Sequence, residues 1–97
     1  MTGYTVSSLG GLVVATRLST RGVDETIACV PADTTAAWQS VALRVLADAG
    51  FVATPEQADA FTRGFFGELS TQRYGVRTLR TSVVEDWIAA QQRGVAC

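Results

Sequence analysis

The chain contains 97 residues, of which 47% are hydrophobic and 18% are charged, and its formal net charge is −1. This apolar content excludes a disordered chain, and nine glycines and two cysteines exclude a collagen-like repeat and a disulfide-rich secreted scaffold. Eight basic residues against nine acidic ones also argue against a generally basic nucleic-acid-binding protein. We expect residues 1–97 to form a single domain.

The first predicted element is a β-hairpin over residues 11–30. Apolar and β-branched residues alternate over residues 12–18, which is typical of a strand. The second run places three residues on one face: Val23, Ile27 and Cys29. Gly22, between the two runs, can adopt the positive φ that a short hairpin loop requires. A further short strand is predicted over residues 4–8.

A first helix is predicted after the hairpin. Its apolar residues recur at the three- and four-residue spacing of an amphipathic helix, and Asp33 or Thr34 can cap its start. Gly50 supplies the left-handed residue that ends such a helix. Trp38 belongs to the apolar stripe, and we expect it to lie in the core and to face the hairpin.

A second helix is predicted from Thr54 to about Arg73. It opens with the spacing of a capping box, in which Thr54 caps the first turn and Gln57 bonds back to Thr54. Gly64 and Gly67 lie inside this helix, where each costs about 1 kcal/mol relative to alanine. They either mark a kink or let another helix approach closely.

The expected partner-binding surface lies on this second helix. Phe65 and Phe66 are consecutive, and consecutive helical residues point about 100° apart, so both cannot face one core. Either one of the rings faces a partner, or the helix bends at Gly64 or Gly67. The partner interface predicted from the sequence therefore consists of Phe65, Phe66, Gly64 and Gly67.

Residues 76–80 form a short predicted extended segment, and a final helix follows it. Ser82 and Glu85 have the spacing of a second capping box, Trp87 points inward, and Gly94 ends the helix. The order of hairpin, two helices, extended segment and helix predicts an α+β fold. In this fold an N-terminal β-hairpin packs on three α-helices.

The sequence offers few residues for catalysis or metal binding. It contains no histidine, the commonest general base and metal ligand, so neither a Ser–His nor a Cys–His pair can form. Two cysteines far apart in sequence cannot supply the four ligands of a structural zinc site. No Walker or dinucleotide-binding glycine motif is present. We expect a protein that is not an enzyme and needs neither cofactor nor metal.

The expected compartment is the cytoplasm. No stretch approaches the roughly 20 apolar residues that cross a bilayer, and the first ten residues lack the pattern of a secretory signal. We therefore expect no membrane partner, and we expect Cys29 and Cys97 to be reduced.

Three arginines form the one asymmetric charge cluster of the sequence. Arg73, Arg77 and Arg80 follow one another with no acidic residue among them, and Tyr74 lies between the first two. Such a patch can neutralise phosphates and stack on a base. The alternative is a solvated surface whose arginines pair with acidic side chains of the last helix.

Residues 75–91 resemble the end of an excisionase or MerR-type winged-helix domain. In that family a basic wing strand precedes a helix of the form S-x-V-E-x-W-I/L, which four residues match: Ser82, Val84, Glu85 and Trp87. The resemblance implies that Arg77 and Arg80 are wing residues that contact the phosphate backbone of DNA.

The sequence favours one function and leaves a second open. A chain this small and this apolar leaves apolar surface in water, which indicates a non-catalytic protein that binds itself or another protein. Its small size, and the fact that all eight of its basic residues are arginines, suggest a bacterial or phage accessory protein. The alternative is an excisionase-like DNA-binding accessory factor, with contacts from Arg73, Tyr74, Arg77 and Arg80.

Overall fold

A computed structural model describes residues 3–19, 22–31 and 35–95 of the chain. Within these residues the elements are, in chain order, β1 (Gly3–Leu9), β2 (Leu12–Leu18), β3 (Glu25–Pro31), α1 (Thr35–Asp48), α2 (Pro55–Phe65), the 3₁₀ turn η1 (Leu69–Thr71), β4 (Tyr74–Arg80) and α3 (Thr81–Val95). The fold is α+β, as the sequence predicts.

The four strands form one antiparallel sheet in the order β3–β2–β1–β4. The predicted hairpin supplies β2 and β3, and the predicted strand at residues 4–8 is β1. The extended segment at residues 76–80 belongs to β4, which pairs with β1. The sheet is therefore larger than an N-terminal hairpin, because β1 pairs on both of its sides.

A β-bulge at Ile27 shifts the register between β2 and β3. Ile27 has no residue directly opposite and packs against the core, whereas Cys29 is exposed and pairs with Val14. The prediction that Ile27 and Cys29 share one face is wrong, because the extra residue of a bulge interrupts the alternation of side chains.

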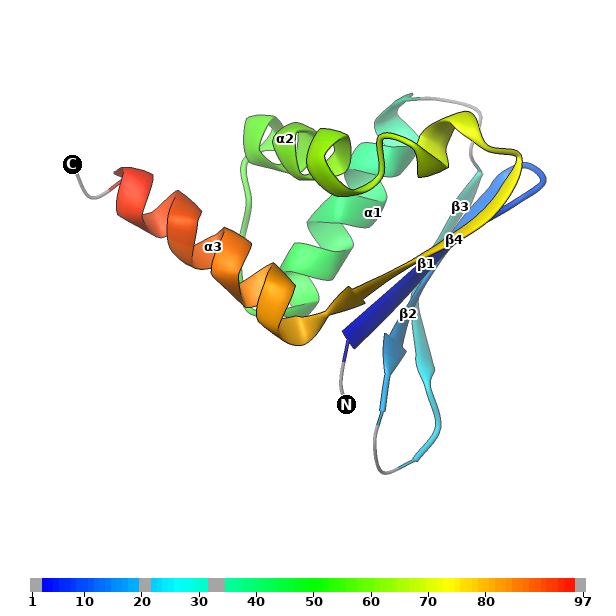
Figure 1. Ribbon diagram of the computed structural model, residues 1–97, viewed down its shortest axis with the longest axis horizontal. Helices are drawn as coiled ribbons and strands as arrows, with labels where there is room; N and C mark the ends of the chain where they lie inside the picture. Colours follow the sequence, from blue (N-terminus) through cyan, green and yellow to red (C-terminus); the bar gives the residue numbers. More distant parts are fainter. Residues whose placement is uncertain (1–2, 20–21, 32–34, 96–97) are drawn as a thin grey trace.

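All three helices lie on the same side of the sheet, where α1 packs on the strands and α2 packs on α1 (Figure 1). Alternate strand residues point into the helical layer and are buried: Tyr4, Val6, Ser8, Val13, Ala15 and Leu79. Helix α1 lies against β2 and β3. Trp38 of α1 is 6% exposed, and its ring centre is 5.9 Å from that of Phe66. The predicted position of Trp38 in the core is confirmed.

Two predicted helix boundaries are confirmed by the backbone. Gly50 follows α1 with a φ of 92°, the left-handed conformation that favours glycine. The capping box of α2 is complete, with Gln57 N donating to Thr54 Oγ1 at 3.2 Å and Thr54 N donating to Gln57 Oε1 at 2.9 Å. The proposed caps of α1, Asp33 and Thr34, lie outside the described residues.

Two other boundaries differ from the prediction. Helix α2 ends at Phe65 instead of continuing to Arg73, and η1 and β4 follow it. Helix α3 begins at Thr81, directly after β4, so Ser82 lies within its first turn instead of before it. Gly94 lies inside α3, which extends to Val95. Glycine is unfavourable inside a helix, but it does not prevent the helix from continuing.

Candidate functional site: the open face of the sheet

The face of the sheet opposite the helices carries no covering element in the described part of the chain (Figure 1). We call this surface the open face. Residues paired directly across antiparallel strands point to the same side, so the register assigns its side chains. They are Thr5, Ser7 and Leu9 of β1; Leu12, Val14, Thr16 and Leu18 of β2; Thr26, Cys29 and Pro31 of β3; and Tyr74, Val76, Thr78 and Arg80 of β4.

Threonines form a row across the middle of the open face. The row runs through all four strands, from Thr78 through Thr5 and Thr16 to Thr26. Threonine is β-branched, favours strands and forms good cross-strand pairs. Stabilisation of the sheet explains this row, which separates two ends of different chemistry.

Apolar side chains gather at the end of the open face beside the β1–β2 turn. Leu9 is 51% exposed, Leu12 44%, Tyr74 68% and Val76 65%, and we call these four residues the apolar end. Leu9 and Tyr74 are directly paired on adjacent strands. An antiparallel sheet with one face in water normally carries polar residues on that face. A contiguous exposed apolar patch instead marks a binding surface.

The composition of β2 carries the sequence signal for this surface. Residues 12–15 are four consecutive apolar residues, so β2 is apolar on both of its faces. Such a run is typical of a strand that is covered on both sides, whereas a half-exposed strand alternates. Val13 and Ala15 are buried under the helices, while Leu12 and Val14 lie on the open face.

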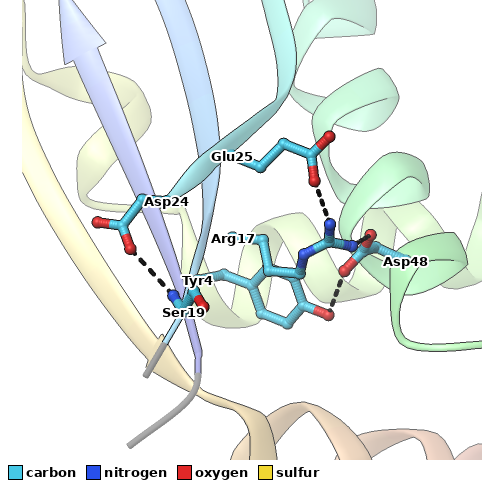
Figure 2. A network of polar contacts seen from close by, with 6 residues as sticks. All are labelled: Tyr4, Arg17, Ser19, Asp24, Glu25 and Asp48. Atoms are coloured by element: carbon cyan, nitrogen blue, oxygen red, sulfur yellow. Dashed lines mark hydrogen bonds and ion pairs between the residues drawn. The ribbon is translucent and has the colours of Figure 1, made fainter. Parts of the chain in front are cut away.

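A polar network joins the sheet to the end of α1 on the covered face (Figure 2). Arg17 forms ion pairs with Glu25 and Asp48, and the Tyr4 hydroxyl donates to Asp48 Oδ2 at 2.8 Å. Burial of the phenol and its hydrogen bond to the Asp48 carboxylate raise the pKa of Tyr4 to about 12. The charges of this network pair with one another, so we interpret the network as structural.

Charged side chains lie at two corners of the open face, at the end away from the β1–β2 turn. Arg80 is the last residue of β4, and Asp24 directly precedes β3. Asp24 Oδ1 accepts a hydrogen bond from Ser19 N at 2.9 Å. Figure 2 shows Asp24 pointing away from α1 and Glu25 pointing toward it. Because β3 and β4 are the outer strands, the anion and the cation lie at opposite lateral edges of the open face.

The predicted interface residues Phe65 and Phe66 both pack inward. Phe66 is fully buried, and its ring centre is 5.6 Å from that of Phe61. Phe65 is partly buried, with its ring centre 4.7 Å from that of Phe61. Helix α2 ends at Phe65, so helical geometry does not separate the two rings. The prediction that Phe66 belongs to a partner interface is therefore wrong, because its side chain is fully buried.

The two glycines of that predicted interface are exposed, but no other helix approaches Gly64. A Cβ atom added at Gly64 would meet nothing within 4 Å. A Cβ atom at Gly67 would lie 3.0 Å from the Arg63 carbonyl oxygen, which belongs to the preceding turn of the same segment. The sequence offers a bend at Gly64 or Gly67 as the alternative to a partner, whereas in the structure α2 ends at Phe65, between these two glycines.

The predicted arginine patch is divided between the two faces of β4. Tyr74 and Arg80 lie on the open face, whereas Arg77 points to the covered side, because side chains alternate along a strand. Arg77 Nη2 lies 3.9 Å from Glu68 Oε2, so its partner is not an acid of the last helix. The Arg73 guanidinium lies 6.0 Å from the centre of the Tyr74 ring.

The described residues contain no group of three or more His, Cys, Asp or Glu side chains that could hold a metal ion. No helix among them is long and apolar enough to cross a membrane.

No protein-family model matches the chain, and neither a curated protein nor a solved structure matches it.

Proposed function

We propose that this protein is a non-catalytic binding protein that acts by protein–protein association through its open face. One observation carries the proposal: among the described residues the helices lie on one side of the sheet, and its other side exposes the apolar end. Leaving these side chains in water forgoes about 25 cal/mol for each Å² of apolar surface that a partner would bury.

Scattered exposed apolar residues need no explanation, and the chain contains some. Val23 and Val52 are 91% and 92% exposed, and each lies in a connection between elements. The apolar end differs because its residues lie on neighbouring strands of a rigid sheet, where they form one surface. Rigid, contiguous apolar surfaces lose little conformational entropy on binding.

The alternative function is that of an excisionase-like DNA-binding accessory factor. It has weaker support, because Arg77 and Arg80 lie on opposite faces of β4 and Arg77 already faces Glu68. A phosphate backbone would meet few cations on either face, and the whole chain carries a net charge of −1. The cytoplasmic location and the bacterial or phage origin remain part of the proposal.

A matched pair of variants tests association through the open face. Val76→Glu introduces a charge into the apolar end, while Val52→Glu introduces the same charge at an exposed valine between α1 and α2. Tagged wild type and both variants are purified from cells of the source organism, and all co-purifying chains, untagged copies included, are quantified by mass spectrometry.

Stoichiometric recovery of a second chain with the wild type and with Val52→Glu, lost with Val76→Glu, is the expected result. Equal recovery with both variants would refute the proposal, as would the absence of any stoichiometric chain with the wild type. Circular dichroism and melting of both variants establish that each remains folded.

A DNA-shift assay tests the alternative. At nanomolar protein and roughly 150 mM salt we expect no shifted duplex, since non-specific binding is weak at that ionic strength. A shift that disappears in the Arg77→Ala, Arg80→Ala double variant would favour the excisionase-like function over association through the open face.

A further inference from the structure

The open face fits a second copy of this chain. We infer that two copies pack their open faces together about a two-fold axis parallel to the strands, with the helices on the outside. The inference rests on the proposed function and names its partner. Three properties of the face support it: its area, its charges and the position of its apolar end.

The area of the open face suits a weak dimer. Strands of seven residues at about 3.3 Å per residue, and four strands about 4.8 Å apart, give a flat area of roughly 440 Å². Two such faces cover about 900 Å², and the relief of the side chains brings the accessible area to the lower end of specific interfaces, about 1,000–1,200 Å². We therefore expect a dissociation constant on the order of micromolar.

The direction of the axis follows from the distribution of side chains. An axis parallel to the strands exchanges the lateral edges of the sheet and keeps its two ends in place. Strand β4 of one copy then lies over β3 of the other, and β1 lies over β2. This is the aligned packing common to two-sheet sandwiches. An axis perpendicular to the strands would place the apolar end over the charged end.

The charges of the open face are complementary in this arrangement. Arg80 at the end of β4 lies over Asp24, beside β3, of the second copy, and the symmetry forms this contact twice. These are the two charged side chains that the described residues place on the open face. The register places no other charged side chain on the open face, so no like charges oppose one another there, and the Arg73 guanidinium beside it lies against the Tyr74 ring.

The apolar end is also complementary to itself. The half formed by β1 and β4 contributes Leu9, Tyr74 and Val76, and the half formed by β2 and β3 contributes Leu12, Val14, Cys29 and Pro31. The two-fold axis places each half over the other half of the second copy. Leu9 of one copy then lies over Leu12 of the other, and Tyr74 and Val76 lie over Pro31 and Cys29. Ser7, which lies over Val14, is the one polar side chain among these contacts, so most of this end is self-complementary in the way an isologous interface requires.

The register makes a specific prediction about Cys29. Cys29 and Val76 occupy the same row of the open face, on the two outer strands, connected through Val14 and Ser7. The axis brings Val76 of one copy close to Cys29 of the other. The two Cys29 residues, in contrast, lie near opposite lateral edges of the dimer, roughly three strand spacings or 14 Å apart along the sheet.

Thiol cross-linking tests this geometry. In a Cys97→Ser background, the Val76→Cys variant treated with a short bis-maleimide should give covalent dimers, because its new thiol reaches Cys29 of the second copy. The background alone and the Val52→Cys variant, at an exposed valine in the helical layer, should remain monomeric. Adding Cys29→Ser to Val76→Cys should abolish the dimer, since both new thiols then lie at opposite edges.

Charge reversal tests the corners independently. By sedimentation at concentrations up to tens of micromolar, Arg80→Glu should weaken self-association about tenfold, because two exposed ion pairs become two like-charge contacts. Adding Asp24→Arg should restore most of the affinity. Arg44→Glu, an exposed arginine on α1, should have no effect.

The outcomes separate the inference from the proposed function. A wild type that stays monomeric at tens of micromolar, but recovers another chain through Val76, overturns the second copy as partner and leaves the proposed function standing. Covalent dimers of the Val52→Cys variant, or an unchanged self-association affinity of Arg80→Glu, would mean that the copies associate through another surface. Either result would also overturn the inference. Absence of both self-association and a second chain overturns both.

Discussion

Ionisation of Tyr4 should destabilise the fold, because the phenol is buried where its charged form is disfavoured. Tyr4 is 4% exposed, and its hydroxyl donates to the Asp48 carboxylate. Its pKa of about 12 in the folded chain compares with about 10 for a tyrosine in the unfolded chain. Since the folded pKa is higher than the unfolded one, the stabilisation is complete below about pH 10 and is lost as the pH rises through about 12.

The size of the effect follows from the two pKa values. Each unit of difference corresponds to about 1.36 kcal/mol, so complete ionisation removes about 3 kcal/mol from the free energy of unfolding. At about pH 11 the unfolded phenol is mostly ionised and the folded one mostly neutral, which gives a loss of about 1 kcal/mol. Small domains are stable by only about 5–15 kcal/mol, so the loss is measurable.

Guanidinium unfolding of the wild type and of Tyr4→Phe, from about pH 8 to about pH 11.5, measures the loss. We expect Tyr4→Phe to be less stable at about pH 8 by roughly 1.5–3 kcal/mol, because it lacks the hydrogen bond to Asp48. Its stability should then fall less with pH than that of the wild type. Tyr74→Phe is the matched control, since Tyr74 is 68% exposed, and it should follow the wild type. Parallel curves for the wild type and Tyr4→Phe would refute the assigned shift.

Three further substitutions test the packing and the helix boundaries by urea unfolding. Trp38→Ala should lower the free energy of unfolding by about 3–5 kcal/mol because the ring is buried, and a melting temperature near that of the wild type would contradict its place in the core. Thr54→Ala should cost about 1 kcal/mol through loss of the capping box, whereas Thr54→Ser should retain most of it. Gly64→Ala should add about 0.5–1 kcal/mol, because a Cβ atom there meets no other atom within 4 Å; destabilisation would reveal another role for this glycine.

The sequence predicts the elements of this fold where a local pattern determines them. Thr54 and Gln57 lie three residues apart and need only each other to form the capping box. Gly50 ends α1 through its own backbone conformation. In each case the deciding contacts lie within a few residues, so spacing alone is sufficient.

The pairing of β1 with β4 could not be predicted in this way. Gly3 pairs with Arg80, and the rest of the two strands follows from that register. Residues 76–80 have the composition of a strand, but no local sequence pattern predicts which strand pairs with them. Their partner, β1, lies more than 60 residues earlier in the chain. The end of α2 at Phe65 was not predicted either, because the apolar spacing continues toward Leu69. The buried Phe66 is a consequence of that early end.

The division of the arginine patch was accessible to sequence reasoning. Arg77 and Arg80 are three residues apart, so a strand places them on opposite faces, whereas a helix would bring them together. The predicted extended segment already contained that result. The polar network at Tyr4 was not accessible, because Tyr4 and Asp48 are 44 residues apart and meet only after α1 packs on the sheet.

The two ends of the open face differ in what sheet stability requires of them. The threonine row lies across all four strands and satisfies the preference of a half-exposed sheet for β-branched residues that tolerate water. Threonines would also satisfy this preference at the end of the open face beside the β1–β2 turn. Leu9, Tyr74 and Val76 occupy that end instead, and all three are exposed to solvent. Stability of the isolated sheet does not explain these side chains, whereas burial against a partner does. For this reason the apolar end, and not the threonine row or the arginines, is the part of the molecule to which we assign its function.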